Sequence, residues 1–211
     1  MLVLVVVCAI ARVSSNAQVS SSPAQTPSPT SEVTPAPEAT AHPSWLSPDQ
    51  KWEYQPPDEG GPKIVKAGTN EVAGDLTDAC DISTCGDAKL VWAPDSKRFA
   101  FNWGQGRTHQ TSLYQLRDDQ WKALKSPDDD VNEILNKAIK RGLPKKTHLR
   151  LIWETVKVHQ WVDSNTAILY GGLEVDEAFG AHFLVTLKFD AQGHWKIIKT
   201  QRLSLKEAEK L

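Results

Sequence analysis

The chain has 211 residues, of which 40% are hydrophobic and 24% are charged, and its formal net charge is -2. These values are typical of a globular protein with a core, and they exclude a chain that is disordered throughout. A net charge so close to zero provides no basic excess, so we expect no nucleic-acid partner.

The N-terminal residues 1–17 are predicted to be a signal peptide. The run from Leu2 to Ala11 is entirely apolar, and it is too short to span a ~30 Å hydrocarbon core as a helix. Ser15 and Ala17 then provide small side chains before a cleavage point, which would leave Gln18 as the new N-terminus. We therefore expect an exported protein, periplasmic or secreted, although no Lys or Arg precedes the apolar run.

Cys8 leaves a second interpretation open. The sequence Val5 to Cys8, VVVC, resembles a bacterial lipobox, whose cysteine is acylated. The small residue expected before that cysteine is replaced by Val7. An acylated Cys8 would anchor the protein to lipid and would add contact with a membrane surface.

The segment 18–48 is predicted to be a disordered linker. It is rich in Pro, Ser and Thr, contains no Lys or Arg, and has too few apolar side chains to offset the entropy of ordering. A β-rich globular domain is expected over residues 49–211. Within it, Cys80 and Cys85 are the two cysteines of the exported chain, and an even count in that compartment favours a disulfide over free thiols.

Alternation of apolar and polar residues predicts β-strands in several segments of this domain. The clearest are 98–103 and 183–189. In the segment 149–158 the apolar residues change phase, which predicts a bulge or a break near Glu154 and Thr155.

One helix is predicted over 128–141. Ser126 is a suitable N-cap, Pro127 a suitable first residue, and acidic residues gather at the N-terminal end while Lys and Arg gather at the other. Gly142 is a typical stop. The apolar stripe on this helix is expected to lie on a sheet, and a second short helix is expected after Ser204.

An internal repeat flanks the helix. In each copy a Trp precedes a polar turn and an apolar strand, and a later strand meets a second polar turn that is followed by Trp-Lys. Trp92 corresponds to Trp161, and Trp121 corresponds to Trp195. The repeat predicts a mainly β fold with two blade-like antiparallel sheet units and one intervening α-helix. The segment Pro48 to Tyr54 echoes the same turn-plus-Trp pattern.

The segment 92–101, WAPDSKRFAF, resembles the repeat of TolB-type β-propellers, in which W-S-P-D-G-K is followed by an apolar strand. Two units cannot close a ring of four to eight blades, so the resemblance implies blade-like sheets rather than a propeller. The domain also resembles uncharacterised exported bacterial proteins with KWEY and VWAPDSKRFAF sequences. That resemblance implies no activity.

Motifs that carry chemistry are absent from the sequence. The six His residues show no metal-ligand spacing, and there is no nucleophile elbow or phosphate-binding loop. We therefore predict no catalytic residue, no metal site and no cofactor. A candidate ligand surface combines Trp103 and its neighbours with the basic stretch 137–150, and its members are Trp103, Arg107, His109, Lys145, Lys146 and Arg150.

These observations favour an exported, non-catalytic binding or interaction protein. Its partner would be an extracytoplasmic protein or a glycan. Two alternatives remain open, namely an extracytoplasmic enzyme of unrecognised class and a lipid-anchored envelope accessory protein. Several His and carboxylate side chains in one deep pocket would favour the enzyme, whereas an aromatic groove near Trp103 would favour glycan binding.

Overall fold

The computed structural model describes residues 45–57, 61–80, 85, 88–142, 150–175 and 179–211, all within one compact unit of the chain, Thr40–Leu211. The predicted signal peptide, Cys8 and residues 18–44 of the predicted linker lie outside the described residues. The backbone N–H of Tyr54 donates to the carbonyl of Trp45 at 2.8 Å, so Trp45 is part of the domain. No described helix is long and apolar enough to cross a bilayer.

The described part of the chain is mainly β, as the sequence predicts. Its elements, in chain order, are β1 (Trp52–Gln55), β2 (Lys63–Lys66), β3 (Val72–Asp75), β4 (Lys89–Trp92), β5 (Arg98–Gln105), β6 (Thr108–Arg117), β7 (Gln120–Ala123), α1 (Asp128–Gly142), β8 (Leu151–Asp163), β9 (Thr166–Val175), β10 (Phe179–Phe189), β11 (Trp195–Leu203) and α2 (Leu205–Ala208).

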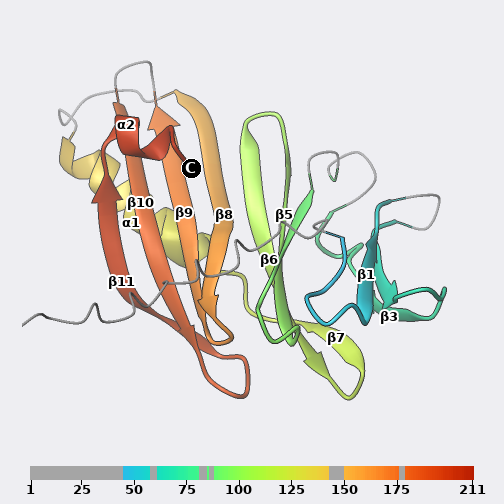
Figure 1. Ribbon diagram of the computed structural model, residues 1–211. Helices are drawn as coiled ribbons and strands as arrows, with labels where there is room; N and C mark the ends of the chain where they lie inside the picture. Colours follow the sequence, from blue (N-terminus) through green and yellow to red (C-terminus); the bar gives the residue numbers. More distant parts are fainter. Residues whose placement is uncertain (1–44, 58–60, 81–84, 86–87, 143–149, 176–178) are drawn as a thin grey trace, which may run out of the picture. The chain divides into compact units, whose positions relative to one another are not determined.

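Two antiparallel meanders account for most of these strands (Figure 1). The first unit consists of β4–β7 and the second unit of β8–β11, with α1 between them in the chain. This arrangement confirms the predicted fold class. A short parallel pairing of β6 with β8 joins the two units into one eight-stranded sheet, in the order β11-β10-β9-β8-β6-β5-β4, with β7 also paired to β6. The strands β1-β2-β3 form a separate three-stranded sheet. Of these three, only the strand at Trp52 was predicted from the sequence.

Local turn chemistry explains the hairpins. Asp118 and Asp119 have φ values of 50° and 58°, which is the backbone of a two-residue hairpin turn whose twist matches the strands. Gly193, with φ 82°, closes the β10–β11 turn. Trp121 and Trp195 follow these two turns directly, so the repeat places them at corresponding positions.

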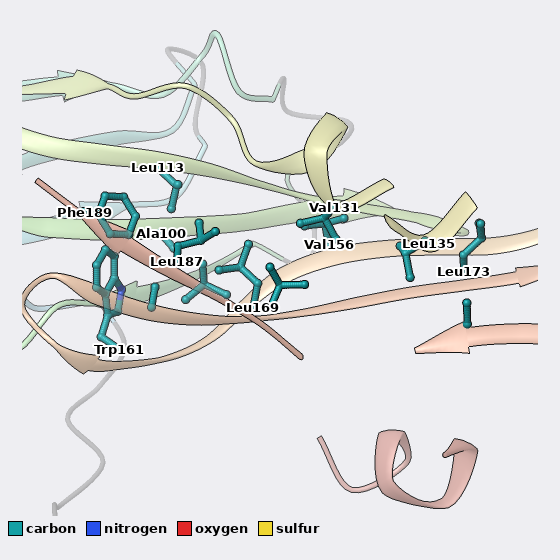
Figure 2. Packing of buried hydrophobic residues seen from close by; sticks show 14 of the residues in the cluster. Ala100, Leu113, Val131, Leu135, Val156, Trp161, Leu169, Leu173, Leu187 and Phe189 are labelled. Atoms are coloured by element: carbon teal, nitrogen blue, oxygen red, sulfur yellow. The ribbon is translucent and has the colours of Figure 1, made fainter. Parts of the chain in front are cut away.

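The core between the two units is built on the β8–β10 surface that α1 covers. Val131, Leu135 and Ile139 of α1 are buried. Figure 2 shows Trp161 and Phe189 at one end of this cluster, where their ring centroids are 5.2 Å apart. The other labelled members are Ala100, Leu113, Val156, Leu169, Leu173 and Leu187.

A second core lies between the three-stranded sheet and the first unit. Phe99 and Phe101 point into it, whereas Ala100 belongs to the other core, so β5 is buried on both faces. The predicted disulfide between Cys80 and Cys85 is present and is part of this second core. The disulfide is compatible with an extracytoplasmic location.

Both helices begin where the sequence predicts them, whereas the predicted irregularity in β8 lies elsewhere in that strand. The side-chain oxygen of Ser126 accepts a hydrogen bond from the backbone N–H of Asp128, and Ser204 forms a capping box with Glu207 at the start of α2. The expected bulge at Glu154 and Thr155 was placed wrongly, because the register of β8 shifts at three other places. Val156 and Val158 of β8 belong to the core that α1 covers, whereas Trp153 of the same strand lines a pocket.

Candidate functional site

The two units separate next to their short junction. Thr108 and His109 of β6 pair with Glu154 and Thr155 of β8, and the ladder ends after these two pairs. Beyond it, the side chain of Asn102 bridges the units, donating to the carbonyl of Val158 at 2.8 Å and accepting from its N–H at 2.9 Å. The junction therefore leaves recessed surface between the units that backbone pairing does not close.

Two adjoining pockets occupy this surface, and we call them together the interunit groove. Their volumes are about 510 Å³ and about 310 Å³, and the larger is well within the range of small-molecule sites. His109 and Lys157 line both pockets, so the two adjoin at these side chains. The other lining residues are Gly106, Arg107, Ile152, Trp153, Thr155, Tyr170 and Ala208 in the larger pocket, and Lys89, Asn102 and Trp103 in the smaller one.

The groove is positively charged. Lys89, Arg107 and Lys157 line it together with His109, and no Asp or Glu is among the lining residues. Within the described residues, none of the three cations forms an ion pair with a carboxylate. Partial burial, and secondarily the charge of Lys89, lowers the pKa of Lys157. The ammonium group of Lys157 lies 5.4 Å from the centre of the Tyr170 ring, which partly compensates its charge.

Two half-buried tryptophans contribute apolar surface to the groove, and Trp103 also packs against the second core. Trp153 lies against Gly172, where a Cβ atom would be 2.6 Å from the indole Cη2. Trp103 is held by its indole N–H, which donates to the hydroxyl of Ser112 at 3.1 Å. One tryptophan lies in each pocket, so each has one flat ring.

A hydrogen bond fixes the floor beneath Lys157. The Tyr170 hydroxyl and His182 Nδ1 are 2.9 Å apart and both residues are buried. Burial raises the pKa of Tyr170 to about 12 and lowers the pKa of His182. A protonated phenol therefore donates to an unprotonated Nδ1, which leaves the His182 proton on Nε2. This pair holds the Tyr170 ring in place under the ammonium group.

The structure brings three of the six predicted surface residues together. Trp103, Arg107 and His109 all line the interunit groove. Arg150 is exposed and is not among the lining residues, while Lys145 and Lys146 lie outside the described residues.

The sequence analysis missed Lys89, Trp153, Lys157 and Tyr170. Each is a single residue in a strand with no local motif. Only the pairing of β6 with β8 and the contact of β4 with the second unit bring them to one place.

The chain matches no protein-family model, no curated protein and no solved structure. Within the described residues, no three His, Cys, Asp or Glu side chains gather around one point.

A smaller pocket of about 270 Å³ lies at the β10–β11 turn, away from the groove. Asp190 and His194 contact each other at this pocket, where their Oδ2 and Nδ1 atoms are 3.1 Å apart. Asp190 also accepts from the backbone N–H of His194. Both side chains therefore stabilise the β10–β11 turn.

Proposed function

We propose that this protein is an exported binding protein and that the interunit groove holds an anionic ligand. The observation that carries the proposal is the convergence of Lys89, Arg107 and Lys157 on one recess whose lining contains no carboxylate. Cations on a protein surface are ordinarily interspersed with acids, and a concentration of one sign in a cleft raises the local concentration of oppositely charged ligands.

The energetics of Lys157 support an anion in the groove. Partial burial and the neighbouring Lys89 disfavour the charged form of this amine in the free protein. An anion bound between the two lysines reverses that effect, because it provides the opposite charge and hydrogen-bond acceptors at once. Lys89 and Lys157 therefore destabilise the protein when the groove is empty, and they stabilise it when an anion is bound.

Export is supported by two independent features. The apolar segment of residues 2–11 is typical of a signal peptide, and the Cys80–Cys85 disulfide is of a kind that is common in oxidising compartments and rare in the cytosol. Acylation of Cys8 would place the same groove near a membrane surface without changing its chemistry. The lipid-anchored alternative thus differs in attachment and not in ligand.

An extracytoplasmic enzyme is the competing proposal, and His109 is the side chain in the groove that would serve as its acid or base. Tyr170 and His182 are buried and are hydrogen-bonded to each other. General acid–base chemistry needs a titrating group within reach of substrate. The groove offers more to binding, because its cations and flat rings hold a ligand without requiring any proton transfer.

Titration of the full chain with anions tests the proposal. Inorganic phosphate, citrate, polyglutamate and carboxylated oligosaccharides are added at low ionic strength while tryptophan fluorescence and heat are recorded. We expect at least one of them to bind, with an affinity that falls as salt is added. Lys157→Met should weaken that binding, whereas Lys122→Met, an exposed lysine on β7, should not. Binding of none of these anions, or equal binding by both variants, would overturn the proposal.

A further inference from the structure

We infer that the ligand of the interunit groove is a saccharide chain that carries carboxylate groups, an inference that rests on the function proposed above. Four features of the groove point to it. They are its two indole rings, its two lysines, the adjacency of its two pockets and the recessed position of its charges.

The indole rings provide the contact that distinguishes a sugar from a simple anion. Trp153 and Trp103 are half-buried, and each lines one of the two pockets. An aromatic ring with one accessible face packs well on the apolar C–H face of a pyranose, whose hydroxyls point outward to polar partners. Tyr170 does not serve this purpose, because it is buried and its ring lies under the Lys157 ammonium group.

The lysines provide the carboxylate site. Lys157 lines both pockets and Lys89 lines the smaller one, and the charge of Lys89 acts on Lys157. A carboxylate placed between two ammonium groups accepts charge-assisted hydrogen bonds from both. Arg107 adds a third cation at the opposite pocket, where it would meet the carboxylate of the next sugar residue.

The shape of the groove favours a chain over a single sugar. The pockets adjoin at His109 and Lys157 and both open to solvent, so a chain of several sugars can contact both where a single sugar fills only one. One ring and at least one cation are available in each pocket. Each pocket can therefore hold one pyranose on its ring and one carboxylate on its cation, which matches a polymer in which every pyranose bears one carboxylate.

Other anionic ligands use only part of this surface. Inorganic phosphate would occupy the lysines and leave both indole rings without a partner. A membrane requires cations that protrude toward the headgroups, whereas Lys157 is half-buried in a recess. A nucleic acid requires a broad basic surface, and the chain has a formal net charge of -2.

The test is a calorimetric and fluorescence titration of the full chain. The probes are oligogalacturonate and oligomannuronate, with methyl-esterified oligogalacturonate as the uncharged counterpart. We expect at least one acidic saccharide to bind, and the methyl ester to bind at least about tenfold more weakly, since each charge-assisted contact is worth about one order of magnitude. Lys89→Met and Lys157→Met should each weaken binding about tenfold, and Lys122→Met should leave it unchanged.

Replacement of the rings separates a saccharide from other anions. Trp153→Leu and Trp103→Leu should each weaken acidic-saccharide binding about tenfold or more, because aromatic anchors dominate such contacts. Trp45→Leu, at a tryptophan that is 49% exposed and outside the groove, is the matched control. Circular dichroism and denaturant melts identify any variant that fails to fold, and the lysine variants then remain as an independent test.

The outcomes distinguish the two proposals. If polyglutamate or phosphate binds in a Lys157-dependent manner while no acidic saccharide does, the saccharide inference is wrong and the anion-binding function stands. The same holds if vesicles of phosphatidylglycerol or a short single-stranded DNA bind in place of the saccharides. If none of these probes binds, both proposals are wrong. Saccharide binding that survives the loss of both rings also overturns the inference.

Discussion

The guanidinium group of Arg98, on β5, donates a hydrogen bond to the side-chain oxygen of Asn165 in the β8–β9 turn at 2.9 Å. It also donates to the carbonyls of Ser164 and Asp190, each at 2.8 Å, and it lies 5.5 Å from the Phe189 ring centre. Because Arg98 is only 4% exposed, one buried cation connects the first unit to two turns of the second.

Replacing Arg98 should therefore loosen the connection between the units. Arg98→Met removes the charge-assisted bonds of a buried guanidinium group to Ser164, Asn165 and Asp190, so we expect a loss of about 2–4 kcal/mol in the free energy of unfolding. Urea denaturation followed by tryptophan fluorescence measures it. Lys97→Met, at the exposed neighbouring position, should change stability by less than about 0.5 kcal/mol. A similar small change for both variants would show that the connection contributes nothing.

The corresponding tryptophans of the two units should differ in their contribution to stability. Trp121 is 5% exposed and makes edge contacts with Trp52, Trp92 and Phe99, so Trp121→Ala should cost about 3–5 kcal/mol.

Trp195 is half-buried and has one indole bond to the Lys125 carbonyl, so Trp195→Ala should cost about 1–2 kcal/mol. Denaturant midpoints of the two variants decide. Midpoints near that of the wild type for both would mean that neither ring supports the fold.

Local turn chemistry made the two meanders predictable. The Asp118–Asp119 and Gly193 turns, and the cap at Ser126, depend on residues close in sequence, so the pattern alone located two hairpins and α1. The three-stranded sheet was harder to find because its strands are four residues long, which is too short for alternation to be distinctive.

Only the part of the candidate site that comes from one short stretch of sequence could be predicted. Trp103, Arg107 and His109 lie on one hairpin, so a local cluster in the sequence became a local cluster in space. Lys157 and Lys89 come from two other strands, and a single lysine in a strand ordinarily indicates only a solvated edge. Their meeting depends on how β4 and β8 pack, and that packing is set by the whole core rather than by any short segment.

Close contact between α1 and β9 depends on the absence of a side chain at Gly171. A Cβ atom there would be 2.6 Å from Cγ1 of Val131, a distance that side chains do not tolerate. Gly171→Ala should push the helix away from the sheet and cost about 1–3 kcal/mol. Gly142→Ala, at the end of the same helix with nothing within 4 Å, is the control and should be neutral or slightly stabilising. Equal midpoints for the two variants would contradict the packing argument.

Loss of the disulfide should weaken the domain without unfolding it. The bond closes a short loop, since Cys80 and Cys85 are five positions apart, so the chain-entropy effect is about 2 kcal/mol. Cys80→Ser should lower the melting temperature, and a reductant should have the same effect on the wild type. Thiol labelling of the unreduced, denatured protein should leave both cysteines unmodified. Labelling of both would show that the disulfide is not formed.

Asp128 should make stability depend on pH between about 4 and 6. Burial raises its pKa to about 6 in the folded protein, against about 3.9 for an unfolded Asp. Between these values the folded state holds a proton that the unfolded state has released, so stability falls as pH rises through this window. His182 contributes the opposite slope, because burial lowers its pKa and folding then favours the neutral ring as pH rises.

Comparison of Asp128→Asn with the wild type isolates the carboxyl group. The amide keeps an oxygen for the backbone N–H of Thr111, which donates to Asp128 Oδ1 at 3.3 Å, but it carries no charge. We expect the variant to be more stable than the wild type by about 1–2 kcal/mol at pH 7, because the uncharged amide avoids the cost of burying an ionised carboxylate, a cost that the helix dipole only partly offsets. The advantage should vanish below pH 4, where the wild-type carboxyl is protonated in both states. Denaturant melts at pH 4, 5, 6 and 7 measure it, and parallel curves for the two proteins would show that Asp128 does not titrate in this window.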